Sequence, residues 1–359
     1  MEAIVTALIE GEEATGKPAK IAVLGAGLIG KRHVQHIMTE PDVTLTGIVD
    51  PAPIGKRLAE EKGVAWFPSF AALLTKQKPD GVIVATPNQL HLPHAMEAIA
   101  AGLPTLIEKP ITDDVASGKK LVEAAESAGV PILVGHHRRH HPMIRRAKEI
   151  IESRRLGRII AVHASCWLMK PADYFEAAWR REKGAGPVYI NLIHDLDLLR
   201  HLCGEVICVQ AFESNAVRGY PVEDSAVILL RFASDALGTV TVSDTIVAPW
   251  SWELTTGENP AYDHTDQSCY HIGGTHGSLT VPQLEVWQNK GERSWWEPIH
   301  TERFPVVFED PLRLQIRHFC RVIRGEEQPL VSGREGLNSL TLVEAVKAAG
   351  RTGQQVAVA

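Results

Sequence analysis

Between Lys20 and Gly135, short apolar runs alternate with segments of helical length. The runs are IAVLG, TLTGIVD, GVIVAT, PTLIEK and PILVG, and the segments between them include residues 93–101 and 114–129. Strands that alternate with helices are joined by right-handed crossovers, which place the strands parallel in one sheet. Because the runs are continuously apolar, the strands are expected to be buried on both faces. The pattern predicts a doubly wound parallel sheet.

After about residue 155 the pattern changes to longer strands without helices between them. GRIIAVHAS, EDSAVILLRF and LGTVTVSDT follow one another as the strands of an antiparallel meander would. Two helical segments, 311–324 and 334–350, close the chain. The expected organisation of the 359 residues is an N-terminal extension (1–19), an α/β dinucleotide-binding domain (20–140) and an α+β domain with an open, mostly antiparallel sheet (141–359), whose last helices can pack back on the first domain.

Charge and apolar content exclude several classes of partner. The formal net charge of −6 gives no electrostatic reason to expect a nucleic acid or an anionic membrane. No apolar run approaches the ~18 to 20 residues that span a bilayer. The five cysteines are scattered without C-x-x-C spacing, so no zinc site is expected. The charge balance therefore favours a small-molecule ligand. The first 20 residues lack the basic region of a secretory signal, which predicts a cytoplasmic location.

The sequence GAGLIG places a G-x-G-x-x-G pattern between a predicted strand and a predicted helix. Here Gly25 permits a tight turn, Gly27 lets the backbone approach a pyrophosphate, and Gly30 allows close packing of the helix. The amides at the start of the helix, including those of Leu28 and Ile29, would donate to the phosphates. The pattern predicts a dinucleotide-binding site.

Asp50 ends the next predicted strand, twenty residues after Gly30. A carboxylate there can accept two hydrogen bonds from the adenosine ribose and would repel a 2′-phosphate, which favours NAD over NADP. The alternative is a turn aspartate before a proline. Lys56 and Arg57 lie close enough in sequence to leave NADP binding open.

Two more motifs, ATPNQLH (85–91) and EKP (108–110), follow predicted strands, at the edge where doubly wound sheets bind ligands. With these motifs the chain resembles the Gfo/Idh/MocA family of nicotinamide-dependent oxidoreductases. The resemblance extends to GHHRRHHP, GAGPVYINLIHDLDLLRHLCG and VSGREGLNSLTLVEAVKAAGRTG. It implies a Rossmann domain, a C-terminal domain with an open mixed sheet, and dimers or tetramers formed through that sheet. The implied reaction is reversible oxidation of a secondary alcohol, most often on a sugar, polyol or cyclitol.

The resemblance also implies roles for individual residues. Lys109 of EKP would lie beside the nicotinamide ribose and the substrate hydroxyl, so it is a candidate for catalysis and for binding both ligands. Trp179 begins a Trp-Arg pair of the kind that borders the nicotinamide pocket. The remaining cofactor candidates are Thr86, Pro87, Asn88, His91 and Glu108.

Hydride removal from a carbinol carbon requires a general base for the hydroxyl proton. Asn191, His194 and Asp197 stand three apart on one face of a predicted apolar helix. We predict that His194 is the base, that Lys109 stabilises the developing alkoxide, and that Asn191 and Asp197 bind substrate. Two alternatives are a satisfied core histidine and a metal site with Asp195 or Asp197. Adjacent residues give poor metal geometry, so no metal is expected.

Position 190 departs from the family pattern. Polyol dehydrogenases of this family commonly carry an aspartate four residues before the histidine, where this chain has Ile190. Asn191 or Asp197 could then orient the imidazole.

Arg138, in GHHRRHHP, is a further candidate for binding substrate. An arginine that reached the substrate would favour a substrate with a carboxylate or phosphate. The other interpretation is that this arginine pair makes structural hydrogen bonds.

The long segment 248–275 carries Trp250 and Trp252, which could stack on a sugar ring or serve an oligomer interface.

Taken together, the motifs predict an NAD-dependent dehydrogenase of a carbohydrate-like or cyclic polyol, acting as a homodimer or homotetramer. An NAD-dependent glycosidase that oxidises C3 transiently, and a non-catalytic NAD-binding regulatory protein, are the alternatives. The presence of both Lys109 and His194 argues against the regulatory protein.

Overall fold

The computed structural model describes residues 17–182 and 184–358, and the chain divides into two compact units. The first unit contains residues up to Gly135 together with Leu312–Gly336, and the second contains His136–Pro311 and the residues from Leu337 onward. The expected boundary at residue 140 therefore lies beyond the division in the structure. The difference arises because the segment after Gly135 pairs with side chains of the second unit. Most of the N-terminal extension expected at 1–19 lies outside the described residues.

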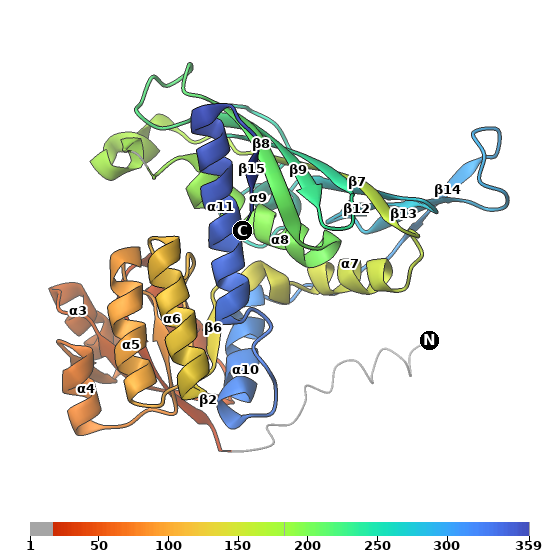
Figure 1. The fold of residues 1–359 in the computed structure, drawn as a ribbon. Coiled ribbons are helices and arrows are strands. Elements are labelled where there is room, and N and C mark those ends of the chain that lie inside the picture. The colour runs from red at the N-terminus through yellow and green to blue at the C-terminus, as the bar shows by residue number, and fades with distance from the viewer. Residues whose placement is uncertain (1–16, 183, 359) are drawn as a thin grey trace. The chain divides into compact units, whose positions relative to one another are not determined.

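The residues of the first unit up to Gly135, coloured red to yellow in Figure 1, contain one parallel sheet of six strands, in the order β3-β2-β1-β4-β5-β6. The strands are β1 (Ala19–Leu24), β2 (Val43–Val49), β3 (Ala65–Phe67), β4 (Gly81–Val84), β5 (Thr105–Ile107) and β6 (Ile132–Val134). The helices are α2 (Leu28–Ile37), α3 (Pro53–Lys62), α4 (Phe70–Lys76), α5 (His91–Ala100), α6 (Val115–Ala128) and α10 (Pro311–Arg324). The strand order reverses between β1 and β4, which is the point where such sheets bind ligands. The predicted doubly wound sheet is confirmed.

Helix α10 joins the first unit although it lies near the end of the chain. Arg313 and Arg317 of α10 donate hydrogen bonds to the two carboxylate oxygens of Glu40. Gly81 lies against the same helix, since a Cβ at this position would be 2.6 Å from Ile323 Cδ1. An ion-paired and closely packed contact therefore fixes α10 beside the parallel sheet.

The second unit is built on a mixed sheet of nine strands, in the order β14-β13-β12-β11-β7-β10-β9-β8-β15. Its strands are β7 (Ile159–Trp167), β8 (Val206–Ser214), β9 (Ser225–Phe232), β10 (Leu237–Ser243), β11 (Tyr270–Gly274), β12 (Ser278–Val281), β13 (Glu285–Asn289), β14 (Ile299–Arg303) and β15 (Val356–Ala357). Strands β8, β9 and β10 form an antiparallel meander. The expectation that 157–165 begins this meander was wrong, because β7 pairs parallel with β10 and antiparallel with β11. A helical connection between β7 and β8 permits this parallel pairing.

One face of the nine-stranded sheet packs against helices, and the other presents side chains to solvent. The helices of this unit are α7 (Pro142–Glu152), α8 (Ile193–Cys203), α9 (Trp252–Thr255) and α11 (Gly333–Thr352). Ile144 of α7, Leu196 of α8 and Val346 of α11 belong to one core with the inner face of the strands. No helix in the described part of the chain is both long and apolar enough to cross a membrane.

Candidate active site

The glycine turn between β1 and α2 has the geometry that a pyrophosphate requires. Gly25 has φ +97°, a conformation that favours glycine. A Cβ at Gly30 would lie 2.1 Å from the carbonyl oxygen of Gly25, so only glycine lets α2 approach this closely. A Cβ at Gly27 would meet no described atom within 4 Å apart from its chain neighbours. Gly27 and the exposed Leu28 that follows it thus leave the start of α2 open to a ligand.

Asp50, after β2, faces the glycine turn. Its Oδ2 accepts a hydrogen bond from the amide of Ala26, and its Oδ1 accepts one from the amide of Ala52, both at 2.8 Å. Each carboxylate oxygen retains a lone pair for a ribose hydroxyl. A pocket lies at the carboxyl ends of β1, β2 and β4, and its lining includes Gly25, Asp50, Phe70, Thr86, Pro87 and His94. The residues present therefore fit the adenosine half of NAD.

His91 links the two remaining cofactor motifs of the first unit. Its ring is fully buried, with Nδ1 2.9 Å from the carbonyl oxygen of Pro110 and Nε2 2.9 Å from that of Thr86. Burial lowers the pKa of His91, so the neutral ring donates to one of these carbonyls at a time. Pro87 and Asn88 between them are exposed. The cofactor contact expected for His91 stays a prediction, since its visible role is to hold the two loops together.

Glu108 and Lys109 follow β5. The Glu108 side chain is buried, and its Oε1 lies 2.7 Å from Nε2 of His33 on α2. Its Oε2 accepts a hydrogen bond from the Lys109 amide at 3.2 Å. Lys109 itself is half-buried, and the Lys109–Pro110 peptide bond is cis. Glu108 therefore ties the EKP turn to α2, and Lys109 extends from this fixed turn.

In the second unit, the helical segment expected to carry His194 changes its winding just before this residue. Val188–Leu192 is a π-helical turn, and α8 begins at Ile193. Such turns occur frequently at functional sites. Asn191 therefore lies about one turn before His194 on the same stretch of helix. The His194 ring is buried, 5.4 Å from the ring of His137 and 6.0 Å from that of His136.

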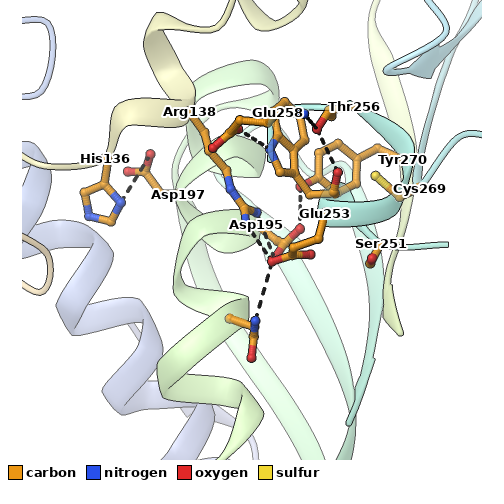
Figure 2. A network of polar contacts seen from close by, with 12 residues as sticks. His136, Arg138, Asp195, Asp197, Ser251, Glu253, Thr256, Glu258, Cys269 and Tyr270 are labelled. Atoms are coloured by element: carbon orange, nitrogen blue, oxygen red, sulfur yellow. Dashed lines mark hydrogen bonds and ion pairs between the residues drawn. The ribbon is translucent and has the colours of Figure 1, made fainter. Parts of the chain in front are cut away.

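A network of buried charges surrounds Arg138 (Figure 2). Arg138 Nη2 donates to Glu253 Oε1 at 2.8 Å, and Nη1 lies 3.7 Å from Asp195 Oδ2. Asn191 Nδ2 also approaches Glu253 Oε1, at 3.5 Å. Tyr270 donates a short hydrogen bond to Asp195. Burial raises the pKa of Asp195 to about 6, against the opposing charge of Arg138.

Asp197 has a different set of partners. Arg139 donates two hydrogen bonds to its carboxylate, at 2.8 and 2.7 Å, and the Ser339 hydroxyl donates a third at 2.6 Å. Although burial opposes ionisation, the charges of His136 and Arg139 hold the pKa of Asp197 below its usual range. Arg138 and Arg139 thus both bind carboxylates of the protein, as the structural interpretation of the arginine pair requires. Asp197, one of these carboxylates, is likewise bound by protein groups. The contact of Arg138 and Asp197 with substrate stays a prediction.

Trp252 is a core residue and fits neither role considered for it. Its side chain is 1% exposed, stacks with Tyr270 at a ring distance of 6.2 Å, and lies under Arg138. Its Nε1 donates to Glu258, whose other carboxylate oxygen lies 2.8 Å from His137 Nε2. Sequence reasoning missed the acids of this network, because the segment drew attention only through its tryptophans.

Two other expectations were that Trp179 borders the nicotinamide pocket and that the chain has no metal site. Trp179 lies in the short helical turn Ala178–Arg181 with 58% of its surface exposed, and Arg180 packs 4.0 Å above the Tyr174 ring. Among residues 17–182 and 184–358, no group of three or more His, Cys, Asp or Glu side chains is arranged to hold a metal ion.

Comparison with known proteins identifies relatives along nearly the whole chain. Scyllo-inositol 2-dehydrogenase (NAD(+)) of Bacillus subtilis is 26% identical, over 94% of this chain and 95% of its own length. D-apiose dehydrogenase of Paraburkholderia graminis is 25% identical, over 98% of this chain and 92% of its own. The WlbA dehydrogenase of Bordetella pertussis, solved in complex with NADH and UDP-GlcNAcA, matches with a TM-score of 0.78 at 25% identity, covering 96% and 99% of the two chains.

Family models match both parts of the chain. Residues 19–136 match a model described as an oxidoreductase family with an NAD-binding Rossmann fold, and residues 148–358 match its C-terminal alpha/beta domain. The predicted α/β fold, the oxidoreductase class and the NAD cofactor are thereby confirmed. The chain belongs to the Gfo/Idh/MocA family of NAD-binding oxidoreductases.

Proposed function

We propose that the protein is an NAD-dependent dehydrogenase that oxidises a secondary alcohol of a neutral sugar, polyol or cyclitol to a ketone, or catalyses the reverse reaction. The charge balance around His194 carries the choice of a neutral substrate. Arg138 is bound by Glu253 and Asp195, and Arg139 is bound by Asp197. The charge of each guanidinium is therefore already balanced by carboxylates of the protein, which disfavours a further carboxylate or phosphate from a substrate. The names of the inositol and apiose dehydrogenases support the same substrate class.

His194 and Lys109 are the proposed catalytic residues. Bound NAD supplies the nicotinamide carbon that takes up a hydride from the carbinol carbon. In the same step the substrate hydroxyl loses its proton to an imidazole nitrogen of His194, and the C–O bond becomes a carbonyl. The Lys109 ammonium stabilises the negative charge that develops on the oxygen. In the reverse direction His194 returns the proton.

The other site residues are proposed to contact the substrate, to position other side chains or to contact the cofactor. Asn191 and Trp179 are the proposed substrate contacts, because Asn191 lies one turn from His194 and Trp179 is exposed. Arg138 and Asp197 act as positioning residues, since their polar groups already bind the protein. The proposed cofactor contacts are Gly25, Gly27, Leu28, Ile29, Gly30, Asp50, Thr86, Pro87, Asn88, His91, Glu108 and Lys109.

The proposal is tested by measuring NAD reduction with a panel of sugars, inositols, sugar acids and cyclic diols. We expect a neutral member of the panel to be the best substrate. Lys109→Ala and His194→Ala should each lower kcat about 10²- to 10⁴-fold, while NADH binding by His194→Ala stays within a few-fold of wild type. The assignment of His194 is wrong if its alanine variant keeps full activity at neutral pH.

We further propose that copies of the chain associate through the open face of the nine-stranded sheet, as a homodimer or homotetramer. Phe212, Val227 and Leu229 are 66%, 51% and 49% exposed on this face. Phe212 of β8 is the register partner of Val227 on β9, so these side chains form one apolar surface. Apolar surfaces of this kind commonly mark protein interfaces. The cytoplasmic location stays a prediction.

A further inference from the structure

Several buried polar atoms of the network around Arg138 make no hydrogen bond to the described residues. The acceptors are Oδ1 of Asn191, Oε2 of Glu253 and Oδ2 of Asp195, and the donors are Nε and Nη1 of Arg138. The other polar atoms of Asn191 and Glu253 are engaged, because Glu253 Oε1 accepts from Arg138 at 2.8 Å and lies 3.5 Å from Asn191 Nδ2. Buried acceptors without partners are uncommon in folded proteins and require an explanation. A ligand with hydroxyl groups would supply the missing partners.

Asn191 and Glu253 are both held in place by the surrounding structure. Asn191 is the fourth residue of the π-helical turn that leads into α8. Glu253 is the second residue of α9, whose first turn is capped by Ser251, since the Ser251 hydroxyl accepts a hydrogen bond from the Leu254 amide. The neighbouring Trp252 is buried in the core. In Figure 2 the Glu253 carboxylate lies beside Arg138 and Asp195, and it belongs to the same network as the helix of His194.

The unsatisfied atoms limit the chemistry of the missing partner. Asn191 Oδ1 and Glu253 Oε2 need a donor, and a hydroxyl can donate to them while its own oxygen accepts from Arg138 Nε or Nη1. The Arg138 guanidinium faces two carboxylates, those of Glu253 and Asp195, so an anionic group would meet excess negative charge. A neutral molecule with adjacent hydroxyls fits these requirements, whereas a sugar acid or a phosphate ester does not.

We propose that Glu253 and Asn191 form a hydroxyl-binding pair, which accepts hydrogen bonds from a substrate hydroxyl adjacent to the carbinol that His194 deprotonates. Glu253 is then a specificity-determining residue that selects vicinal diols over isolated alcohols. This inference rests on the proposed dehydrogenase activity and adds a substrate feature to it. A site built to bind a hydroxyl discriminates strongly against an analogue that lacks it, because the buried acceptors are then left unpaired.

Glu253→Gln tests the pair with little change in shape. The amide oxygen can still accept from Arg138, but the second acceptor atom becomes an NH₂ donor. We expect kcat/KM to fall about 30-fold for the best polyol, mostly through KM, since the lost hydrogen bond involves a charged group. For the analogue without the adjacent hydroxyl, the same variant should change kcat/KM less than about 3-fold. Asn191→Ala should show the same dependence on that hydroxyl, and it decides the question if Glu253→Gln does not fold.

Glu213→Gln is the matched control. Glu213 lies on β8, its side chain is 15% exposed, and it forms an ion pair with Lys347 at 2.7 Å. The Glu253 side chain is similar, with 12% exposure and an ion pair to Arg138 at 2.8 Å. Its variant should leave the ratio of kcat/KM for the two substrates unchanged. Equal losses on both substrates in Glu253→Gln and Asn191→Ala, or no loss on either, would overturn the pair while leaving the dehydrogenase activity intact. A wild-type protein that reduces NAD with no polyol would overturn both proposals.

Discussion

At the residue scale, two aspartates of α8 that are two positions apart have opposite electrostatic environments. Burial raises the pKa of Asp195 to about 6, although the charge of Arg138 at 3.7 Å and hydrogen bonds from Tyr270 and Cys166 oppose the shift. Asp197 is equally buried, but the charges of His136 and Arg139 outweigh burial and keep its pKa below the usual range. Ionised Asp195 therefore lowers the stability of the fold, whereas ionised Asp197 raises it.

Asp195→Asn should reveal the cost of this buried charge. The pKa of Asp195 is higher in the folded state, about 6, than in the unfolded state, roughly 3.9. The stability that Asp195 contributes is therefore fully present below the unfolded pKa and is lost as the pH rises through about 6. The free energy of unfolding of the variant, relative to wild type, should therefore increase by about 2 kcal/mol between pH 4.5 and 7.5. Denaturant titrations at a series of pH values measure it.

Asp197→Asn provides the control for that experiment. A lowered pKa gives stability that is present above the unfolded value and is lost only as the pH falls below it. The variant should be destabilised by about 3 kcal/mol, because Arg139 loses its ionised partner, and by the same amount at pH 4.5 and 7.5. Parallel pH curves for the wild type and Asp195→Asn would contradict the assignment for Asp195.

Asp50 is expected to set the preference for NAD. Asp50→Asn keeps an oxygen that can accept from one of the two backbone amides, Ala26 or Ala52, but it removes the charge that repels a 2′-phosphate. We expect about 10-fold weaker NAD binding and tighter NADP binding, measured by fluorescence titration of each cofactor. Unchanged affinities for both would show that Asp50 is only a turn residue.

At the element scale, the turn between β1 and α2 offers two glycines with separable roles. Gly27→Ala adds a methyl group where no described atom lies within 4 Å, so thermal stability should change by less than about 1 kcal/mol. The same methyl group would occupy the approach of the pyrophosphate, and NAD affinity should fall at least about 10-fold. Calorimetric unfolding and NAD titration on the same sample measure both effects.

Gly30→Ala is the companion variant with the opposite pattern. Its methyl group would lie 2.1 Å from the Gly25 carbonyl oxygen, which forces α2 away from the turn. We expect a loss of about 2 to 3 kcal/mol of stability together with weaker NAD binding. If Gly27→Ala proved as unstable as Gly30→Ala, the open space at Gly27 would not be a ligand site.

Most elements of the first unit were predictable because they depend on local sequence, although β3 was not among the expected strands. The apolar runs and the glycine turn define β1, β2 and α2 without reference to distant residues. In the second unit the lengths of the strands were evident but their pairing was not. β7 pairs with strands that begin 70 or more residues later, and nothing in its own sequence specifies a parallel partner.

At the scale of the whole molecule, the open face of the nine-stranded sheet exposes apolar side chains that an interface would cover. Val227→Lys would place a charge in the middle of the apolar surface that includes Phe212 and Leu229. In a self-complementary interface each copy contributes the same residue, so two lysine charges would be buried together. We therefore expect light scattering to show a shift toward the monomer. Val217→Lys is the control, because Val217 is 72% exposed outside the strands. An unchanged mass for Val227→Lys would exclude this face as the interface.

The site could be predicted only where its residues share a short segment. Asn191, His194 and Asp197 were identified from their spacing on one helix, and Lys109 from the motif that contains it. Glu253 lies 62 positions from Asn191, and only folding brings the two side chains together. Asp197 was expected to face substrate, but its spacing could not show that Arg139 and Ser339 already bind it.

The central claim is that the protein transfers a hydride between a polyol carbon and NAD. The most direct measurement uses the best neutral polyol with deuterium at the reacting carbon, followed by analysis of the cofactor and the product. We predict equal amounts of ketone and of reduced cofactor carrying the deuterium, and neither product with His194→Ala on the same timescale. Polyol conversion without net reduced cofactor, or tight NAD binding without turnover on any member of the panel, would contradict the claim.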